Sequence, residues 1–215
     1  AFLQDIKKVL APDGLFVIQM NYLPTMLNGN AVDNISHEHL CYYSFMTLNN
    51  LLDKNGFQVE DVSFSNLNGG SFRVYVRHGK ADGLHFGPSV ITTVEHEWAS
   101  NLHTLGPYKA FSQRIRENSY KLESFIKIQK AKGERIMVLG TSTRGAVLMQ
   151  LAGLDRKAID FAVERDPSKV GKVYVGDIPI ISEQLAHDLG ADYYLILPYW
   201  FAPEIMEREK DFLLN

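Results

Sequence analysis

Apolar residues follow two different spacings along the first part of the chain, and each spacing predicts a different element. Residues 1–10 repeat apolar positions at intervals of three and four, which predicts an amphipathic helix. Pro and Gly within residues 11–14 predict a turn, and the apolar run LFVIQM at residues 15–20 predicts a buried strand. Residues 21–35 follow neither spacing and are rich in Asn and Gly, so they predict a long loop.

A helix and a pair of strands are predicted next. Ser44 has the side chain of an N-cap, and the helix that it begins is expected to end at residues 55–56, Asn-Gly. Residues 57–64 and 72–77 alternate apolar and polar side chains, which predicts two antiparallel strands. The polar, glycine-containing residues 80–89 predict a linker.

The second half of the chain predicts an α/β unit. A long helical region extends to about residue 130, and residues 135–164 then follow the order strand, glycine-rich turn, helix, strand. A last strand is predicted at residues 193–198, and a helix follows it. The fold class is therefore α/β, with one domain at residues 1–86 and a linking helix plus a Rossmann-like unit at residues 87–215.

Composition and charge narrow the class of protein. The chain has 215 residues, of which 46% are hydrophobic and 22% charged, as is ordinary for a soluble globular protein. A formal net charge of −3 argues against nonspecific nucleic-acid binding, and no apolar stretch has the length of a membrane span. A single cysteine, Cys41, excludes an internal disulfide and a zinc site of several cysteines. With no signal-peptide pattern, a cytoplasmic protein is expected.

A glycine-rich turn lies between an apolar strand and a helix, where α/β sheets bind phosphate groups. The turn consists of Gly140, Thr141, Ser142, Thr143, Arg144 and Gly145. Its glycines allow a tight bend, the helix N-terminus carries partial positive charge, and its polar side chains donate hydrogen bonds to an anion. Glu164 ends the next apolar strand, where such folds place a carboxylate on a ribose hydroxyl. The alternative is a plain β–α turn, since the sequence is neither GxGxxG nor a P-loop.

Two histidines flank a glutamate at the end of the predicted loop. In extended backbone, His37 and His39 point to one side and Glu38 to the other. A histidine with an ordinary pKa of about 6.5 acts as a general base at neutral pH, and Glu38 is placed to orient His39 or a substrate hydroxyl. No third ligand stands at an obvious spacing, so no metal site is predicted. Loop histidines without chemistry are the alternative.

Three further polar residues are weaker candidates for ligand binding. Asn68 and Arg73 lie in the segment NLNGGSFR, where two glycines precede a strand. The residues alone favour a hairpin connection with an exposed arginine there. Tyr199 follows the last strand, at the edge of a sheet where α/β proteins bind ligands, although a packing role explains it equally well.

These segments resemble, in order, a family of sugar C-methyltransferases that alkylate nucleotide-linked keto-deoxysugars with S-adenosylmethionine. The runs HEHLCYYSFMTLNNLLDKNGFQVEDV and NGGSFRVYV resemble it most specifically. VLGTSTRGAVLMQ, VERDPSKVGKVYVGDIPIIS and LILPYWF are similar to the family's C-terminal domain, and FLQDIKKVLAPDGLFVIQM to the late part of a class I methyltransferase domain. The resemblance covers the whole chain. It implies a partial class I methyltransferase (Rossmann-like) domain followed by a smaller Rossmann-like αβα domain.

The resemblance also implies a mechanism and a set of site residues. A base removes the proton beside the keto group, and the enolate carbon then attacks the methyl group of S-adenosylmethionine. His39 is the implied base, and Glu38 holds the sugar or His39. Candidates for stabilising the enolate oxygen, from position only, are His37, Asn68 and Arg73. The C-terminal domain is implied to bind the nucleotide diphosphate of the keto-sugar.

Two departures from the family pattern change the expectation for this chain. Ser36 stands where the family has Tyr before the His-Glu-His run, so an aromatic hydroxyl is absent there. The family's cysteine-rich zinc segment and glycine-rich cofactor loop are missing before Leu15, and the chain starts inside a predicted helix without Met. We therefore expect a truncated enzyme, inactive as this fragment, that binds S-adenosylmethionine weakly or not at all.

Two rival functions fit parts of the sequence. A non-catalytic module that binds a nucleotide or nucleotide sugar needs only the second domain. An oxidoreductase with a dinucleotide site is disfavoured, because Ser142 stands at the middle glycine position and crowds the approach of a pyrophosphate. The sequence leaves the sugar, the nucleotide and the oligomeric state open.

Overall fold

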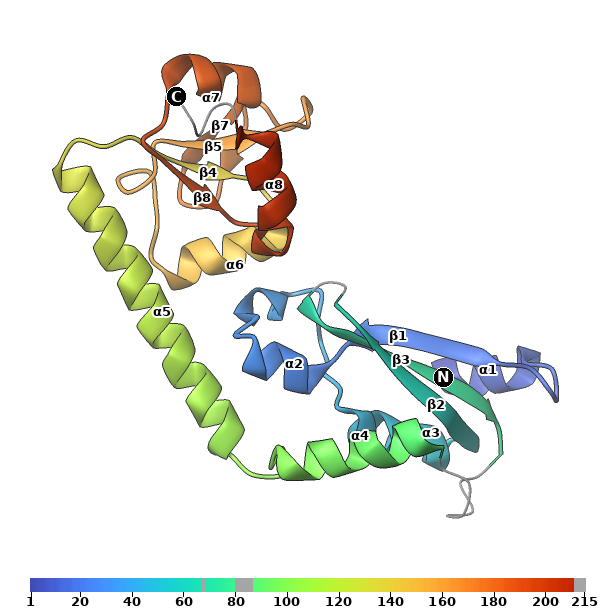
Figure 1. Cartoon of the computed structure of the whole chain (residues 1–215). Coiled ribbons are helices and arrows are strands. Elements are labelled where there is room, and N and C mark those ends of the chain that lie inside the picture. Colours follow the sequence, from blue (N-terminus) through green and yellow to red (C-terminus); the bar gives the residue numbers. More distant parts are fainter. Residues whose placement is uncertain (67–68, 80–86, 211–215) are drawn as a thin grey trace. The chain divides into compact units, whose positions relative to one another are not determined.

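Two compact units make up the protein, for which a computed structural model describes residues 1–66, 69–79 and 87–210. Unit 1 comprises Ala1–Ala31 and Leu40–Ser112, and unit 2 comprises Val32–His39 and Gln113–Asn215. Each unit contains one β-sheet with helices beside it (Figure 1). The α/β fold class expected from the sequence is therefore confirmed.

The helical region that joins the two halves of the sequence consists of two helices, α4 (Pro88–Ala99) and α5 (Gly106–Ala131). One long helical region was predicted there. The second helix starts at Gly106-Pro107, since proline is tolerated only in the first turn of a helix. The linker expected at residues 80–89 lies largely outside the described residues, as does the boundary expected after residue 86.

Unit 1 is built on a three-stranded antiparallel sheet. Its strands are β1 (Phe16–Asn21), β2 (Phe57–Ser65) and β3 (Ser71–His78), in the order β1-β3-β2. The predicted antiparallel pairing of β2 with β3 is confirmed, and Val74 and Val76 of the central β3 are fully buried. The prediction of a buried strand at residues 15–20 is wrong in one respect. β1 is an edge strand, so alternate side chains such as Val17, 43% exposed, reach solvent.

Helices of unit 1 begin where local signals place them. α1 (Phe2–Val9) lies in the predicted N-terminal segment. The predicted N-cap of α3 (Phe45–Lys54) is confirmed: Ser44 Oγ accepts a hydrogen bond from Thr47 N at 3.3 Å, and Ser44 N donates to Thr47 Oγ1 at 3.1 Å. This reciprocal capping box satisfies two backbone donors that the helix itself leaves unpaired.

The segment at residues 21–35 is not the long loop that was predicted. It contains the helix α2 (Leu23–Asn28) and the short 3₁₀ helix η1 (Val32–Asn34). Pro24 stands in the first turn of α2, where its missing N–H costs nothing. Met26 and Leu27 are each 4% exposed, so burial of apolar side chains stabilises a helix that the composition did not suggest.

Unit 2 is built on a five-stranded, mostly parallel sheet in the order β6-β7-β5-β4-β8. The strands are β4 (Ile136–Leu139), β5 (Phe161–Glu164), β6 (Val173–Tyr174), β7 (Ile178–Ser182) and β8 (Tyr193–Ile196). β4 pairs parallel with both β5 and β8, β5 pairs parallel with β7, and β6 pairs antiparallel with β7. Helices α6 (Thr143–Leu151), α7 (Glu183–Leu189) and α8 (Ala202–Arg208) accompany the sheet.

Helices cover both faces of this sheet. Successive side chains of a strand point to opposite faces, and those of β4 belong alternately to two hydrophobic clusters. One cluster contains Ile136 together with Met149 of α6. The other contains Met137 together with Ala186 of α7, and Ile205 of α8 packs against it. Since β4 is buried on both faces, its residues form a continuous apolar run.

The strand order of unit 2 contains a switch point between β4 and β8. The parallel strands lie in the order β7-β5-β4-β8, which is third, second, first and fourth along the chain. The first strand connects to β5 through α6, and β8 lies on its other side, so the direction of winding changes between β4 and β8. Doubly wound sheets bind ligands outside the carboxyl ends of the two strands at such a switch point.

The sequence patterns predicted some helices and strands of unit 2 and did not predict others. The predicted succession of strand, turn, helix and strand is confirmed as β4, α6 and β5, and the predicted strand at residues 193–198 as β8. The elements β6, β7 and α7 were not predicted. β6 has only two residues, and Pro179 interrupts the apolar run of β7.

Candidate functional site

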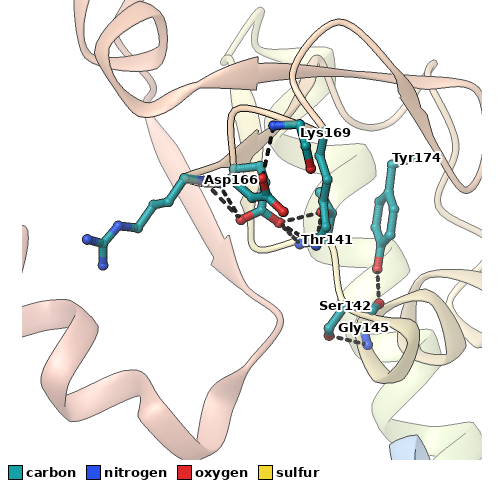
Figure 2. A network of polar contacts seen from close by, with 9 residues as sticks. Thr141, Ser142, Gly145, Asp166, Lys169 and Tyr174 are labelled. Atoms are coloured by element: carbon teal, nitrogen blue, oxygen red, sulfur yellow. Dashed lines mark hydrogen bonds and ion pairs between the residues drawn. The ribbon is translucent and has the colours of Figure 1, made fainter.

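The glycine-rich turn joins the carboxyl end of β4 to α6. Gly140 has a φ of +86°, a left-handed backbone conformation that favours glycine. Ser142 Oγ accepts a hydrogen bond from Gly145 N at 3.0 Å and so caps α6 (Figure 2). A Cβ on Gly145 would lie 2.9 Å from both Leu197 Cδ1 and Tyr174 Oη, so glycine is required there by close packing.

A hydrogen bond from Tyr174 also stabilises this turn. Its hydroxyl donates a hydrogen bond to the backbone oxygen of Ser142 at 2.7 Å, as Figure 2 shows. Burial, and secondarily the carboxylate of Glu164, raise the pKa of Tyr174 well above its ordinary value. The hydroxyl therefore stays protonated at physiological pH and remains a donor to the turn.

Glu164, at the end of β5, accepts hydrogen bonds from Thr141, Lys169 and the backbone of Asp166, the three residues that Figure 2 labels beside the turn. Its Oε2 accepts hydrogen bonds from Thr141 Oγ1 at 2.5 Å and from Lys169 Nζ at 3.2 Å. Its Oε1 accepts from the backbone N–H groups of Arg165 at 2.9 Å and Asp166 at 3.3 Å. Burial acts to raise the pKa of Glu164, but the hydrogen bonds outweigh it and lower the pKa to about 2.

Lys169 is a site residue that the sequence reasoning missed. Its ammonium group lies 3.2 Å from Glu164 Oε2 and 3.4 Å from Thr141 Oγ1, and its side chain is 40% exposed. A lysine five residues after the strand-ending carboxylate was the available signal. It places a cation beside the glycine-rich turn, where a phosphate group would be attracted.

We expect the Glu164→Gln variant to lose less stability in acid than the unaltered chain does. The folded-state pKa of Glu164 is lowered to about 2 from the ordinary 4.5, so its contribution is fully present above pH 4.5. That contribution is lost as the pH falls from about 4.5 towards about 2. Urea unfolding at pH 7, 5 and 3 measures it, and Glu207→Gln is the control, because Glu207 is 74% exposed. Equal pH dependence in all three proteins would contradict the assignment.

Arg144 and Tyr199, both predicted to bind a ligand, are brought together by a third residue, Asp33. Arg144 Nε donates to Asp33 Oδ2 at 2.7 Å, and Arg144 Nη2 lies 2.5 Å from the same oxygen. Tyr199 Oη donates to Asp33 Oδ1 at 2.9 Å. Burial, together with the Asp33 carboxylate, raises the pKa of Tyr199. Asp33 was not predicted as a site residue, because a lone Asp in an Asn-rich segment has no local signature.

The segment with the two histidines also belongs to unit 2, and its backbone is not extended. His39 N donates to Ser36 O at 3.1 Å, which closes a turn, so the predicted alternation of His37 and His39 on one side against Glu38 is wrong. His37 Nε2 instead lies 3.8 Å from Glu38 Oε1, and both side chains are well exposed. Ser36 N also donates to Asn34 O at 3.0 Å, so two backbone hydrogen bonds stabilise this bent segment.

His39 is held by the backbone in one tautomer. Its Nδ1 lies 2.6 Å from the carbonyl oxygen of Asn34. A carbonyl oxygen only accepts hydrogen bonds, so Nδ1 is the nitrogen that carries the proton. The lone pair of the neutral ring is then on Nε2, as a general base requires.

The remaining predicted residues are not part of this arrangement. Arg73 lies on β3 in unit 1, where its Nε and Nη2 donate to Gln19 Oε1 at 3.1 and 2.8 Å. Asn68 lies outside the described residues, and Thr143 is exposed in the first turn of α6. Within residues 1–66, 69–79 and 87–210, no three His, Cys, Asp or Glu side chains are grouped to hold a metal ion. No helix in those ranges has the length and apolar character needed to cross a membrane.

Comparison with known proteins gives two findings. A family model described as the C-methyltransferase C-terminal domain matches residues 66–215. The C-methyltransferase NovU of Streptomyces niveus is 33% identical over 214 residues, which are 99% of this chain and 51% of that relative. The chain thus spans about half the length of the curated relative that it matches.

Proposed function

The chain belongs to the C-methyltransferase family, and from this premise we propose that it takes part in methylating a carbon of a nucleotide-linked keto-deoxysugar. One observation carries the proposal. The glycine-rich turn, which suits a phosphate group, and His39, which suits proton removal, lie in the same compact unit. A substrate with a nucleotide handle and an acidic C–H needs both functions at one site.

We propose the arrangement of domains that the resemblance implies. Unit 1 is then the later part of a class I methyltransferase domain. The strand order of unit 2 supports a Rossmann-like domain, which follows the helices that begin at Pro88 in the sequence.

Unit 2 binds the nucleotide diphosphate in this proposal. Backbone N–H groups at the start of α6 and the hydroxyls of Thr141 and Ser142 face an anion at the turn. Lys169 adds a positive charge there. When Lys169 moves from the Glu164 carboxylate to the phosphate, that carboxylate accepts a hydrogen bond from a ribose hydroxyl. Arg144 and Tyr199 complete the site from the ends of neighbouring strands.

His39 removes the proton in the proposed chemistry. The C–H bond beside the keto group breaks, its proton goes to Nε2, and its electron pair becomes the enolate. The enolate carbon attacks the methyl group of S-adenosylmethionine, the second substrate. The bond between that methyl group and sulfur breaks, its electron pair stays on sulfur, and S-adenosylhomocysteine leaves. The enolate oxygen needs a donor nearby, for which His37 is the candidate on the same segment. Glu38 Oε1 lies 3.8 Å from His37 Nε2 on the same segment.

Neither the β1–α2 connection nor the β2–β3 pair of unit 1 supplies a glycine turn between a strand and a helix. β1 passes into α2 through Tyr22, and no glycine lies between them. β2 and β3 pair with each other as antiparallel neighbours. Cofactor sites in Rossmann-like folds use such a glycine turn. We therefore propose that S-adenosylmethionine is bound by other parts of a complete enzyme.

A non-catalytic nucleotide-binding module is the second candidate. The observation that favours it is that the family model matched describes a C-terminal domain, and that unit 2 alone carries the glycine-rich turn among the described residues. Both candidates predict nucleotide binding, and they differ in whether proton removal occurs.

We expect this chain to bind nucleoside diphosphates and not S-adenosylmethionine. A ligand at ten times its Kd stabilises the folded state by about 1.4 kcal/mol, which raises the Tm by several degrees. The measurement is a thermal shift with dTDP, UDP, GDP, NAD and S-adenosylmethionine, followed by calorimetric titration. Stabilisation by NAD alone would favour an oxidoreductase instead. Micromolar binding of S-adenosylmethionine would contradict the assignment of the donor site to other parts of the enzyme.

A further inference from the structure

Asp33 is a buried carboxylate on η1 whose two oxygens each have a partner from a distant part of unit 2. Its exposed fraction is 2%. Arg144 binds Oδ2 and Tyr199 binds Oδ1, at 2.7 and 2.9 Å. Removing a carboxylate from water costs several kcal/mol unless a cation and hydrogen bonds replace the water. Asp33 is therefore buried together with the groups that compensate its charge.

Both partners of Asp33 lie at the switch point of the sheet. Arg144 is the second residue of α6, which follows β4, and Tyr199 begins η3 (Tyr199–Phe201), which follows β8. These two strands are neighbours, and their carboxyl ends form the edge at which doubly wound sheets bind ligands. Asp33 thus attaches its own segment to the edge where we place the nucleotide.

The attached segment contains His39. The residue after Asp33 is Asn34, which is also 2% exposed, and its carbonyl oxygen lies 2.6 Å from His39 Nδ1. A short, buried path therefore connects the carboxylate of Asp33 to the ring that we propose as base. Asp33 lies on η1, and the turn closed by His39 N and Ser36 O follows it directly, so both residues belong to one short hydrogen-bonded segment.

We propose that Asp33 is a positioning residue that couples nucleotide binding to the orientation and tautomer of His39. The inference rests on the proposed function of His39. Arg144 belongs to the glycine-rich turn, so a diphosphate bound there and the Asp33 carboxylate contact the same guanidinium group. A nucleotide in the site therefore alters the ion pair between Arg144 and Asp33, and the change reaches His39 through Asn34. By linkage, the position of His39 also changes the affinity for the nucleotide.

The test uses this chain and the ring nitrogens of His39, observed by ¹⁵N nuclear magnetic resonance. In the unaltered chain we expect the Nδ1–H tautomer, with signals that shift when dTDP or UDP is added. In Asp33→Asn we expect a mixture of tautomers and at least about tenfold faster amide exchange at residues 34–39. Tyr199→Phe, which keeps the ion pair, should fall between the two. Arg144→Lys, which loses the Nε contact, takes the place of Asp33→Asn if that variant does not fold.

Asp160→Asn is the matched control. Asp160 accepts from Lys130 Nζ at 2.7 Å and from Ile136 N at 2.8 Å, so its loss weakens an ion pair of unit 2 away from His39. Its His39 signals should match those of the unaltered chain. A folded Asp33→Asn variant with unchanged His39 signals and exchange would overturn the inference. A chain that binds no nucleoside diphosphate contradicts the proposed function, whereas the comparison of the free chains still decides the role of Asp33.

Discussion

His39→Asn is expected to abolish methyl transfer in the complete enzyme, lowering kcat by about 10²- to 10⁴-fold. The asparagine amide can still donate to the Asn34 carbonyl that holds His39 Nδ1, so the turn should persist. It has no basic nitrogen to take the proton, so the enolate does not form. Binding of nucleoside diphosphates should stay within about twofold of the unaltered protein, because the asparagine keeps the contact with the Asn34 carbonyl and so the position of the segment.

Proton removal can be measured without the methyl donor. In D₂O, this chain should catalyse deuterium incorporation beside the keto group of a nucleotide-linked keto-deoxysugar, and His39→Asn should not. His96→Asn, an exposed position on α4, is the control for a general effect of losing a histidine. Unchanged turnover in His39→Asn would exclude His39 as the base. Loss of exchange in His96→Asn as well would indicate that the measurement follows folding and not chemistry.

Sequence patterns predicted best the elements whose determinants are local. The Ser44 cap and the β4–α6–β5 unit each depend on residues within a few positions of one another, and both are confirmed. α2 was missed because its stability comes from the burial of Met26 and Leu27, which no spacing along this segment indicates. The edge position of β1 was missed for a similar reason, because the residues of a strand do not determine how many other strands pair with it.

The candidate site shows the same division. Gly140 and Ser142 were identified from their place between a strand and a helix, and the structure gives each a local reason. Asp33 was missed because its partners, Arg144 and Tyr199, stand 111 and 166 positions away in the chain. The fold brings these three residues together at the ends of β4 and β8, and no spacing along the chain predicts such a contact.

Gly145→Val is expected to have the largest effect on unit 2, lowering its free energy of unfolding by about 3 kcal/mol. Gly145 is buried, and a Cβ there meets Leu197 and the Tyr174 hydroxyl at 2.9 Å, shorter than ordinary van der Waals contact. Leu197 belongs to the hydrophobic cluster between the sheet and α6, so α6 must move away from the sheet. That movement also breaks the Ser142 cap, which uses Gly145 N.

The consequence reaches the proposed nucleotide site, because α6 carries the N–H groups that face the diphosphate. We expect the affinity of Gly145→Val for dTDP or UDP, whichever the chain binds, to fall at least about tenfold at a temperature where unit 2 stays folded. Gln150→Val is the control, since it places a β-branched side chain at an exposed position of the same helix, away from the glycine-rich turn. Urea unfolding followed by circular dichroism and calorimetric titration measure both effects. If Gly145→Val unfolds and binds as the control does, close packing at this glycine does not shape the turn.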